Sequence, residues 1–192
     1  MSSRMTHGAG KREKIVVISG PSGVGKSTIC RRLVKRMGAQ LSISVTTRPI
    51  SPKETEGVDY YFITEEEFRN KIERGDFLEY ARVFDNFYGT PRQKVEDDLN
   101  AGKTVILEID IQGARAVRQV YPDAITVFIL PPQTRDLLAR MSGRARDSAG
   151  VIEKRLARAN EEIAAARQFY KYMVVNNDLA QAVNEIVNII QT

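Results

Sequence analysis

A glycine-rich segment near the N-terminus limits the folds open to this chain more than any other feature. The segment SGPSGVGKST, residues 19–28, directly follows the apolar run KIVVI and opens a stretch with helical periodicity. Its glycines allow a sharp turn in which several backbone N–H groups point inward, next to the positive end of the following helix. A strand, a glycine-rich loop and a helix in this order predict an α/β fold whose loop binds an anion.

The rest of the chain alternates between apolar runs and amphipathic stretches. We expect strands at 14–19, 41–45, 104–110, 124–130 and 172–175, and helices at 26–37, 112–120, 133–141, 151–170 and 179–190. Strands that are apolar throughout are typical of a parallel sheet covered by helices on both faces. The pattern therefore predicts a parallel sheet flanked by helices, and together with the glycine-rich loop after the first strand it predicts a P-loop NTPase fold.

The alternation is interrupted between about residues 45 and 90. The aromatic run YYF is β-like, and Thr64 with Glu67 forms a capping box at the start of a helix. The run FLEYARVF indicates another strand, after which Thr90-Pro91 starts a new helix. We therefore predict an inserted small lobe, made of short antiparallel strands plus one helix.

Length and composition fit a single domain. Residues 1–13 are small, polar and charged, and predict a flexible tail before a domain at 14–192. No apolar run is long enough to span a bilayer or to act as a signal segment, and Cys30 has no second cysteine to pair with, so we expect a cytoplasmic protein. The net charge is +5, but the chain has no run of five basic residues. We therefore expect neither nucleic acid nor a membrane as partner.

The glycine-rich segment matches the pattern G-x-x-x-x-G-K-[ST]. Lys26 can reach terminal phosphates, and the hydroxyl of Ser27 can ligate Mg²⁺. We therefore predict that the loop binds a nucleoside triphosphate, which leaves a hydrolase, a switch protein and a kinase open. The expected ATP-binding residues of the loop are Gly20, Pro21, Ser22, Gly23, Val24, Gly25, Lys26, Ser27 and Thr28.

Two observations favour a kinase. The only histidine, His7, lies in the tail, so the core has no Ser-His or Cys-His pair for nucleophilic catalysis. A kinase whose acceptor is a phosphate needs no general base, because the attacking oxygen is already ionised, but it needs positive charge. Arg140 and Arg144 are four residues apart, and Arg146 and Arg155 flank a glycine-bounded break. These arginines are expected either in a mobile phosphate-binding flap or on a solvated basic face.

The ordered motifs along the chain resemble those of the guanylate kinases, which transfer phosphate from ATP to GMP. The resemblance extends from about residue 15 to residue 190. The motifs are SGPSGVGKST, SVTTRP, EGVDYYF, GDFLEYARVFDNFYGT, LEIDIQGA, FILPP, GRARDS, KRLARA and VVNNDL. An ordered series of this kind is far more specific than a lone P-loop.

The resemblance implies a GMP-binding lobe at about 45–90 and a lid at about 141–151. It implies a guanine site at Ser44, Glu79, Thr90 and Asp110, a GMP phosphate site at Arg48, Tyr60 and Tyr88, catalytic residues Lys26, Arg140, Arg144 and Arg155, and adenine contacts at Asn176 and Pro131-Pro132. A carboxylate at 79 can accept both N1–H and the exocyclic amino group of guanine. Mg²⁺ is the implied cofactor, held by Ser27, with Asp110 helping through water.

Three positions depart from the pattern of many guanylate kinases. Ser51 stands where many members carry a second arginine for the GMP phosphate, and the nearby Lys53 cannot reproduce a bidentate fork. Ala145 replaces a lid glycine, and Glu108 replaces an aspartate of the same charge.

Two other functions stay open from the sequence. One is a related P-loop kinase with a different phosphorylated acceptor, such as a ribose bisphosphate, which Ser51 allows and which Glu79 and Tyr88 disfavour. The other is a non-catalytic guanylate-kinase-like binding module, which the intact Lys26 and Ser27 disfavour.

Overall fold

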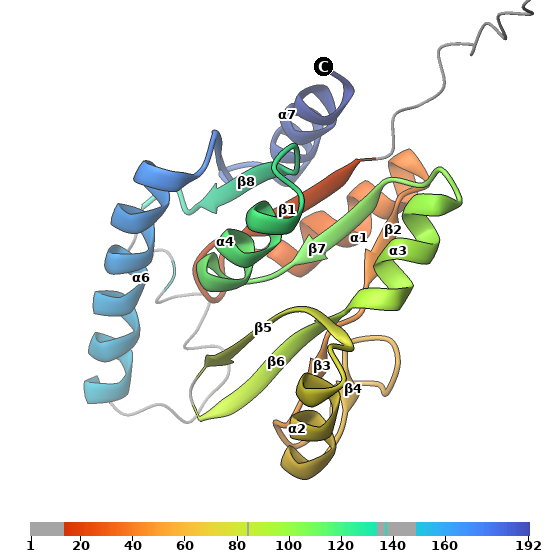
Figure 1. Ribbon diagram of the computed structural model, residues 1–192. Coiled ribbons are helices and arrows are strands. Elements are labelled where there is room, and N and C mark those ends of the chain that lie inside the picture. The colour runs from red at the N-terminus through yellow and green to blue at the C-terminus, as the bar shows by residue number, and fades with distance from the viewer. Residues whose placement is uncertain (1–13, 84, 134–136, 138–148) are drawn as a thin grey trace, which may run out of the picture.

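The computed structural model describes residues 14–83, 85–133, 137 and 149–192, and for 149–156 and 158 it describes the backbone alone (Figure 1). The tail at 1–13, most of the helix expected at 133–141 and most of the lid expected at 141–151 lie outside these residues. The boundaries of the tail and the lid therefore stay predictions.

A parallel sheet of five strands forms the core, in the order β2-β7-β1-β8-β9. Val16 in the central strand pairs with Ile106 on one side and Ile125 on the other. All residues of the central strand are buried, because both faces of the sheet are covered, as the apolar runs predict. The strands are β1 (Ile15–Ser19), β2 (Gln40–Ser42), β7 (Val105–Glu108), β8 (Ile125–Leu130) and β9 (Tyr172–Val175).

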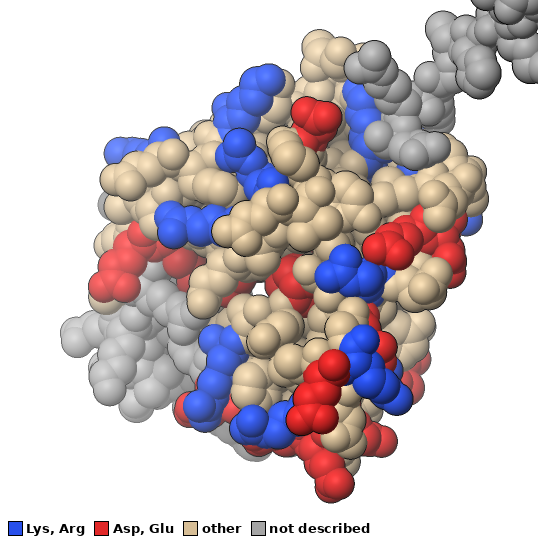
Figure 2. All heavy atoms as spheres, viewed as in Figure 1, with Lys and Arg blue, Asp and Glu red and all other residues tan. Residues whose placement is uncertain are grey.

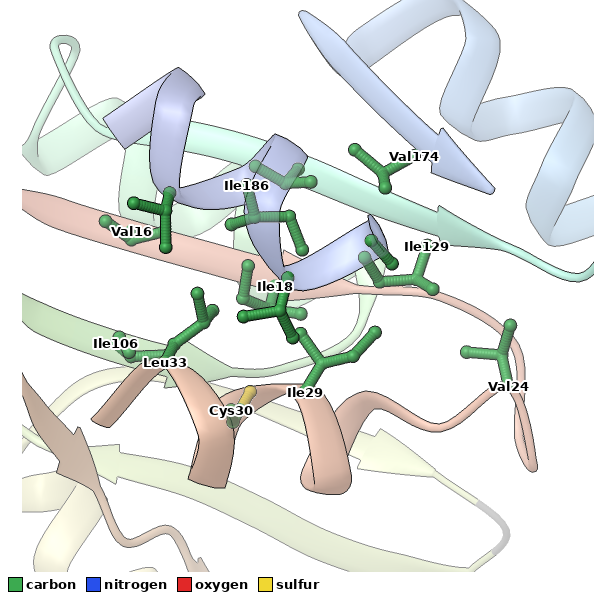
Figure 3. Close-up of a cluster of buried hydrophobic side chains, with 14 of the residues drawn as sticks. Val16, Ile18, Val24, Ile29, Cys30, Leu33, Ile106, Ile129, Val174 and Ile186 are labelled. Atoms are coloured by element: carbon green, nitrogen blue, oxygen red, sulfur yellow. The ribbon is translucent and has the colours of Figure 1, made fainter. Parts of the chain in front are cut away.

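Helices cover the two faces of this sheet. Helices α1 (Lys26–Met37) and α7 (Leu179–Gln191) lie on one face, and α3 (Arg92–Asn100), α4 (Ile111–Val120) and α6 (Ala149–Phe169) lie largely on the other (Figure 1). Alternate residues of the central strand enter the two apolar clusters. Ile18 packs with Leu33 and Ile186 between the sheet and α1 and α7, as Figure 3 shows, whereas Val17 packs with Val117 on the opposite face.

The two ends of the described chain lie beside each other. Lys14 precedes β1, and its Nζ donates a hydrogen bond to the carbonyl oxygen of Ile190 in the last turn of α7. The start of the first strand is thereby joined to the end of the last helix.

A second sheet of four strands forms the small lobe, in the order β4-β3-β6-β5. The expectation of antiparallel strands is correct for β3 with β6 and for β5 with β6, but β3 and β4 are parallel, so the sheet is mixed. The segment 47–60 returns the chain to the same end of β3, which permits the parallel pair. The strands are β3 (Val45–Thr46), β4 (Tyr61–Phe62), β5 (Phe77–Val83) and β6 (Asn86–Pro91).

The single strand expected at 41–45 is wrong, because the chain divides there between two sheets. Ser42 pairs with Leu107 in the core, whereas Val45 pairs with Gly89 in the small lobe. The chain therefore leaves the core sheet at residues 43–44 and enters the lobe.

Helix α2 (Glu65–Glu73) closes one face of the small sheet, and its predicted capping box is present. Phe68 is fully buried, with its ring centroid 4.4 Å from that of Phe77 and 5.3 Å from that of Phe87. The lobe therefore has a small aromatic core of its own.

Acidic and basic side chains are interspersed over the face shown in Figure 2, on the core and on the small lobe. The positive net charge is therefore not gathered into one basic area on that face. Of the helices in the described part of the chain, none combines the length and the apolar character that crossing a bilayer requires.

Candidate active site

The glycine-rich loop connects the buried end of β1 to the first turn of α1. Gly25 is the N-cap of α1 with φ of 101°, a conformation that residues with a side chain rarely adopt. A Cβ atom at this position would also lie 2.7 Å from Nδ2 of Asn176. The loop therefore needs glycine here both for its backbone turn and for the close approach of a neighbouring side chain.

Two contacts hold the loop against the core. The side chain of Val24 is fully buried in the cluster between the sheet and helices α1 and α7. Its carbonyl oxygen accepts a hydrogen bond of 2.8 Å from Nδ2 of Asn176, whose backbone N–H donates to the carbonyl of Leu130. Asn176, expected to contact adenine, thus lies at the end of β9 and supports the loop, and its adenine contact stays a prediction.

Lys26 and Ser27 lie at the start of α1 with different partners. Lys26 Nζ donates to the carbonyl oxygens of Gly20 at 2.7 Å and Pro21 at 3.2 Å, and burial lowers the pKa of Lys26 below its ordinary value. Ser27 Oγ donates to Oε1 of Glu108 at 2.7 Å. The lysine therefore points back over the loop, and the serine reaches the carboxyl end of β7.

The residues at the end of β7 suit Mg²⁺. This ion prefers hard oxygen ligands and usually keeps several waters, with one or two protein ligands and the substrate phosphates. The Ser27 hydroxyl and the Glu108 carboxylate supply such oxygens, and Asp110 follows two residues later. Among the described residues, no group of three or more acidic, histidine or cysteine side chains forms an all-protein metal site.

A buried carboxylate lies where the small lobe meets the core. Glu79 on β5 and Thr90 on β6 are opposite each other in the small sheet, and Thr90 Oγ1 donates to Oε1 of Glu79 at 2.5 Å. Glu79 is only 6% exposed, and this burial, together with the charge of Asp110, raises its pKa to about 7 against the opposing effect of the Thr90 hydrogen bond. The site therefore holds a carboxyl group that changes charge near neutral pH.

Asp110 lies on the core side of this carboxylate, and its charge acts on Glu79. It is the N-cap of α4, and its Oδ1 accepts a 2.9 Å hydrogen bond from the backbone N–H of Gly113. The loop is therefore linked through Ser27 and Glu108 to the chain segment of Asp110, and the charge of Asp110 acts on Glu79.

A cationic and aromatic group lies on the same lobe. The Arg48 guanidinium carbon is 5.5 Å from the ring centroid of Tyr60, which is 5.9 Å from that of Tyr88. Burial and the charge of Glu108 raise the pKa of Tyr60 to about 12. The three residues expected to bind the GMP phosphate are thus brought together, and the Glu108 charge acts on one of them.

The partner of Arg48 is an acidic residue that the sequence reasoning missed. Both terminal nitrogens of Arg48 donate to the Glu54 carboxylate, at 2.7 Å and 3.0 Å, and this pairing raises the pKa of Arg48 above its ordinary value. The backbone N–H of Ser51 donates to the same carboxylate at 2.9 Å. The only signal in the sequence is the six-residue spacing from Arg48 to Glu54, which does not specify a loop contact.

The structure describes some of the remaining predicted site residues, whereas others lie outside the described part of the chain. Ser44 is half-buried between the two sheets, and its carbonyl accepts a hydrogen bond from the N–H of Tyr61. Pro131 is buried and Pro132 half-buried, directly after β8. Arg140 and Arg144 lie outside the described residues, as does the side chain of Arg155, so their roles stay predictions.

The surface is hollowed between the core and the small lobe in the view of Figure 2. Beside Asp110, a cavity of about 250 Å³ lies between the first turn of α4 and helix α6. Its lining is Asp110, Ile111, Gln112, Arg115, Glu161, Glu162 and Ala165. Open space therefore adjoins Asp110, the N-cap of α4.

Comparison with known proteins identifies the family. The model of the guanylate kinase family matches residues 12–192. A guanylate kinase of Symbiobacterium thermophilum is 49% identical over 92% of this chain and 83% of its own length, and one of Clostridioides difficile is 43% identical over 95% and 89%.

Solved structures agree with this assignment. The crystal structure of a guanylate kinase from Anaplasma phagocytophilum matches with a TM-score of 0.79 at 34% identity, covering 94% of this chain and 86% of that chain. A gluconokinase from Sinorhizobium meliloti, with a TM-score of 0.54 at 18% identity, shows the fold alone. From its P-loop to its last helix, this chain belongs to the guanylate kinase family.

Proposed function

We propose a role for each site residue in the transfer of the terminal phosphate of ATP to GMP. The guanylate kinase relatives indicate that this chain carries out that reaction. The P-loop at 20–27 and Thr28 bind the ATP phosphates through backbone N–H groups, and Lys26 turns from the loop carbonyls to the terminal phosphates. Asn176 and the adjacent Pro131-Pro132 are the proposed contacts of the adenine.

Mg²⁺ fits the end of β7. Ser27 would be its protein ligand, and Glu108, which accepts the Ser27 hydrogen bond, and Asp110 would hold its water ligands. Bound there, the ion neutralises charge on the ATP phosphates and orients them for transfer.

GMP lies in the small lobe. Glu79 accepts the two adjacent donors of guanine, with Thr90, Ser44 and Asp110 around the base. The observation that carries this proposal is the buried Glu79 carboxylate, held by Thr90 on the same sheet as the group that binds phosphate. That group, Arg48 with Tyr60 and Tyr88, holds the GMP phosphate.

Transfer itself needs positioning and positive charge. The attacking oxygen belongs to the GMP phosphate and is already ionised near neutral pH, so no side chain removes a proton. Lys26 and the lid arginines Arg140, Arg144 and Arg155 stabilise the charge on the phosphoryl group as it moves, and closure of the lid excludes water.

The alternatives of the sequence reasoning are not favoured. The relatives over nearly the whole chain are named guanylate kinase, and a ribose bisphosphate has no base for Glu79 to bind. A binding module without catalysis has no need of Lys26. Partners are the small molecules ATP and GMP, and the cytoplasmic location stays a prediction from the sequence.

Phosphotransfer assays with GMP, AMP, CMP, UMP and ribose bisphosphate test this proposal. We expect GMP to be the preferred acceptor and Lys26→Ala to lose at least about 100-fold in kcat, as for loss of one transition-state charge contact. Lys35→Ala, an exposed lysine on the same helix, is the matched control and should keep wild-type turnover. Near wild-type turnover of Lys26→Ala, or preference for another acceptor, would contradict the proposal.

A further inference from the structure

Gly113 lies in a helix, and its backbone conformation does not explain why the residue is a glycine. It is the third residue of α4, within the first turn of a helix, and is buried. Its φ angle is not in the left-handed region, which other glycines of the chain adopt. Since glycine is a poorer helix former than alanine, some other requirement must account for it.

That requirement is the space taken by Glu79. A Cβ atom at position 113 would lie 2.5 Å from Oε2 of Glu79 and 3.0 Å from its Cδ. The other oxygen of the same carboxylate is the acceptor of the Thr90 hydroxyl. The carboxylate is therefore fitted between the Thr90 side chain on the small lobe and the backbone of α4 on the core.

The backbone of Gly113 also binds the second carboxylate of the site. Its N–H donates to Oδ1 of Asp110, so Glu79 and Asp110 approach the helix at the same residue. Helix α4 belongs to the core and β5 to the small lobe, so this residue is a contact between the two parts.

We propose that Gly113 is a positioning residue for guanine specificity, because its missing side chain leaves the space that holds the Glu79 carboxylate. The inference rests on the proposed role of Glu79 as the reader of guanine. A methyl group at 113 would force Oε2 back by roughly 1 Å to reach an ordinary contact distance. Guanine binding depends on both oxygens of this carboxylate, so the shift weakens GMP, whereas ATP binds at the P-loop and is unaffected.

The fold tolerates this change better than the site does. The atoms that the methyl group meets belong to side chains, the carboxylate of Glu79 and Cδ1 of Ile109 at 3.3 Å, and the ends of these side chains can shift. Alanine also favours the helical backbone more than glycine does. We therefore expect Gly113→Ala to keep its melting temperature within a few degrees while the KM for GMP and the dissociation constant of GMP alone rise at least tenfold. The KM for ATP should change less than twofold and kcat less than threefold.

A double-mutant cycle separates this role from a general effect on α4. We compare Gly113→Ala, Glu79→Ala and the double variant by calorimetric titration with GMP and by steady-state kinetics. In the Glu79→Ala background the methyl group has no carboxylate to displace, so the double variant should bind GMP within twofold of Glu79→Ala. A disturbed helix would weaken GMP by the same factor in both backgrounds and would overturn the inference, as would unchanged GMP binding by Gly113→Ala.

Two further outcomes distinguish a wrong guanine site from a variant that folds poorly. If Glu79→Ala itself binds GMP like the wild type, the proposed guanine site is wrong, whatever Gly113→Ala does. If Gly113→Ala folds poorly, the double variant should recover the melting temperature of Glu79→Ala, which supports the same contact. A double variant that is as unstable as Gly113→Ala overturns the inference.

Discussion

The hydroxyl of Ser27 donates a 2.7 Å hydrogen bond to the carboxylate of Glu108, and this contact joins the P-loop to the carboxyl end of β7. The two residues are 81 positions apart in the sequence, and the parallel pairing of β1 with β7 brings them together. The contact places Glu108 beside the P-loop, whereas the sequence alone indicated only that a glutamate replaces an aspartate at this position.

Glu108→Gln should reduce the apparent affinity for Mg²⁺. The amide keeps the size of the side chain but removes the charge beside Ser27, and loss of such an outer contact typically costs 10–100-fold in metal affinity. Turnover at varied Mg²⁺ with saturating ATP and GMP measures the effect. Glu66→Gln on the exposed face of α2 is the control, and an unchanged Mg²⁺ dependence of Glu108→Gln would remove Glu108 from the metal site.

GMP binding should weaken as pH falls below 7. Burial raises the pKa of Glu79 to about 7, and only the ionised carboxylate accepts both guanine donors. We expect kcat/KM for GMP to fall towards tenfold per pH unit below 7 and to level off above it. The GMP phosphate titrates near pH 6 as well, so the control is Glu79→Gln, which shares that titration. Parallel profiles for the two proteins would contradict the assignment.

The same carboxyl group should make folding stability depend on pH. Its pKa in the folded state is above that of an unfolded glutamate, so the folded state binds the extra proton between about pH 4.5 and 7. The free energy of unfolding should therefore decrease across this window as pH rises, by up to about 3 kcal/mol. Urea unfolding at pH 5 and pH 8 checks this, and Glu79→Gln should lose that part of the pH dependence.

Asn176→Ala should raise the KM for ATP and lower stability. The variant leaves the buried carbonyl of Val24 without its side-chain donor, which costs about 1–3 kcal/mol. It also removes a contact that holds the ATP-binding loop in place beside Gly25. Thermal unfolding and ATP-dependent kinetics measure the two effects, with Asn70→Ala on the exposed surface of α2 as control. Unchanged ATP kinetics would show that the loop does not depend on this contact.

Ser51→Arg should strengthen GMP binding. The backbone of Ser51 is held by the same Glu54 carboxylate that pairs with Arg48, so an arginine there would start beside the proposed phosphate site. We expect the KM for GMP to fall by up to about tenfold, equivalent to about 1.4 kcal/mol, with little change in kcat. Ser51→Lys adds the same charge without a planar fork and should gain less. An unchanged or higher KM for GMP would contradict the hypothesis that Ser51 marks a missing contact to the GMP phosphate.

The features that the sequence predicted well depend on local patterns or on a run of motifs. The P-loop, the capping box of Thr64 and Glu67 and the apolar strands all involve neighbouring residues, and the structure confirms them. The division of residues 41–45 between two sheets was missed, because it is decided by strands far along the chain.

The contacts between distant residues of the site were missed for the same reason. Asn176 reaches Val24 across 152 positions, and no pattern near either residue indicates the pairing. Gly113 resembles an ordinary helix residue until Glu79 is packed against it. The motifs of the family indicate which residues matter, whereas the geometry indicates what each of them contacts.

The hydrogen bond from Lys14 to the carbonyl of Ile190 has a consequence for the order of elements in the chain. Since the first strand starts beside the end of the last helix (Figure 1), a short glycine-serine linker can join residue 192 to residue 14. New termini can then be opened at the exposed turn of Ala101 and Gly102, between α3 and β7. Such a circular permutant begins at β7, and we expect it to keep every strand pair of both sheets, because these pairs do not depend on the order in which the chain connects the strands.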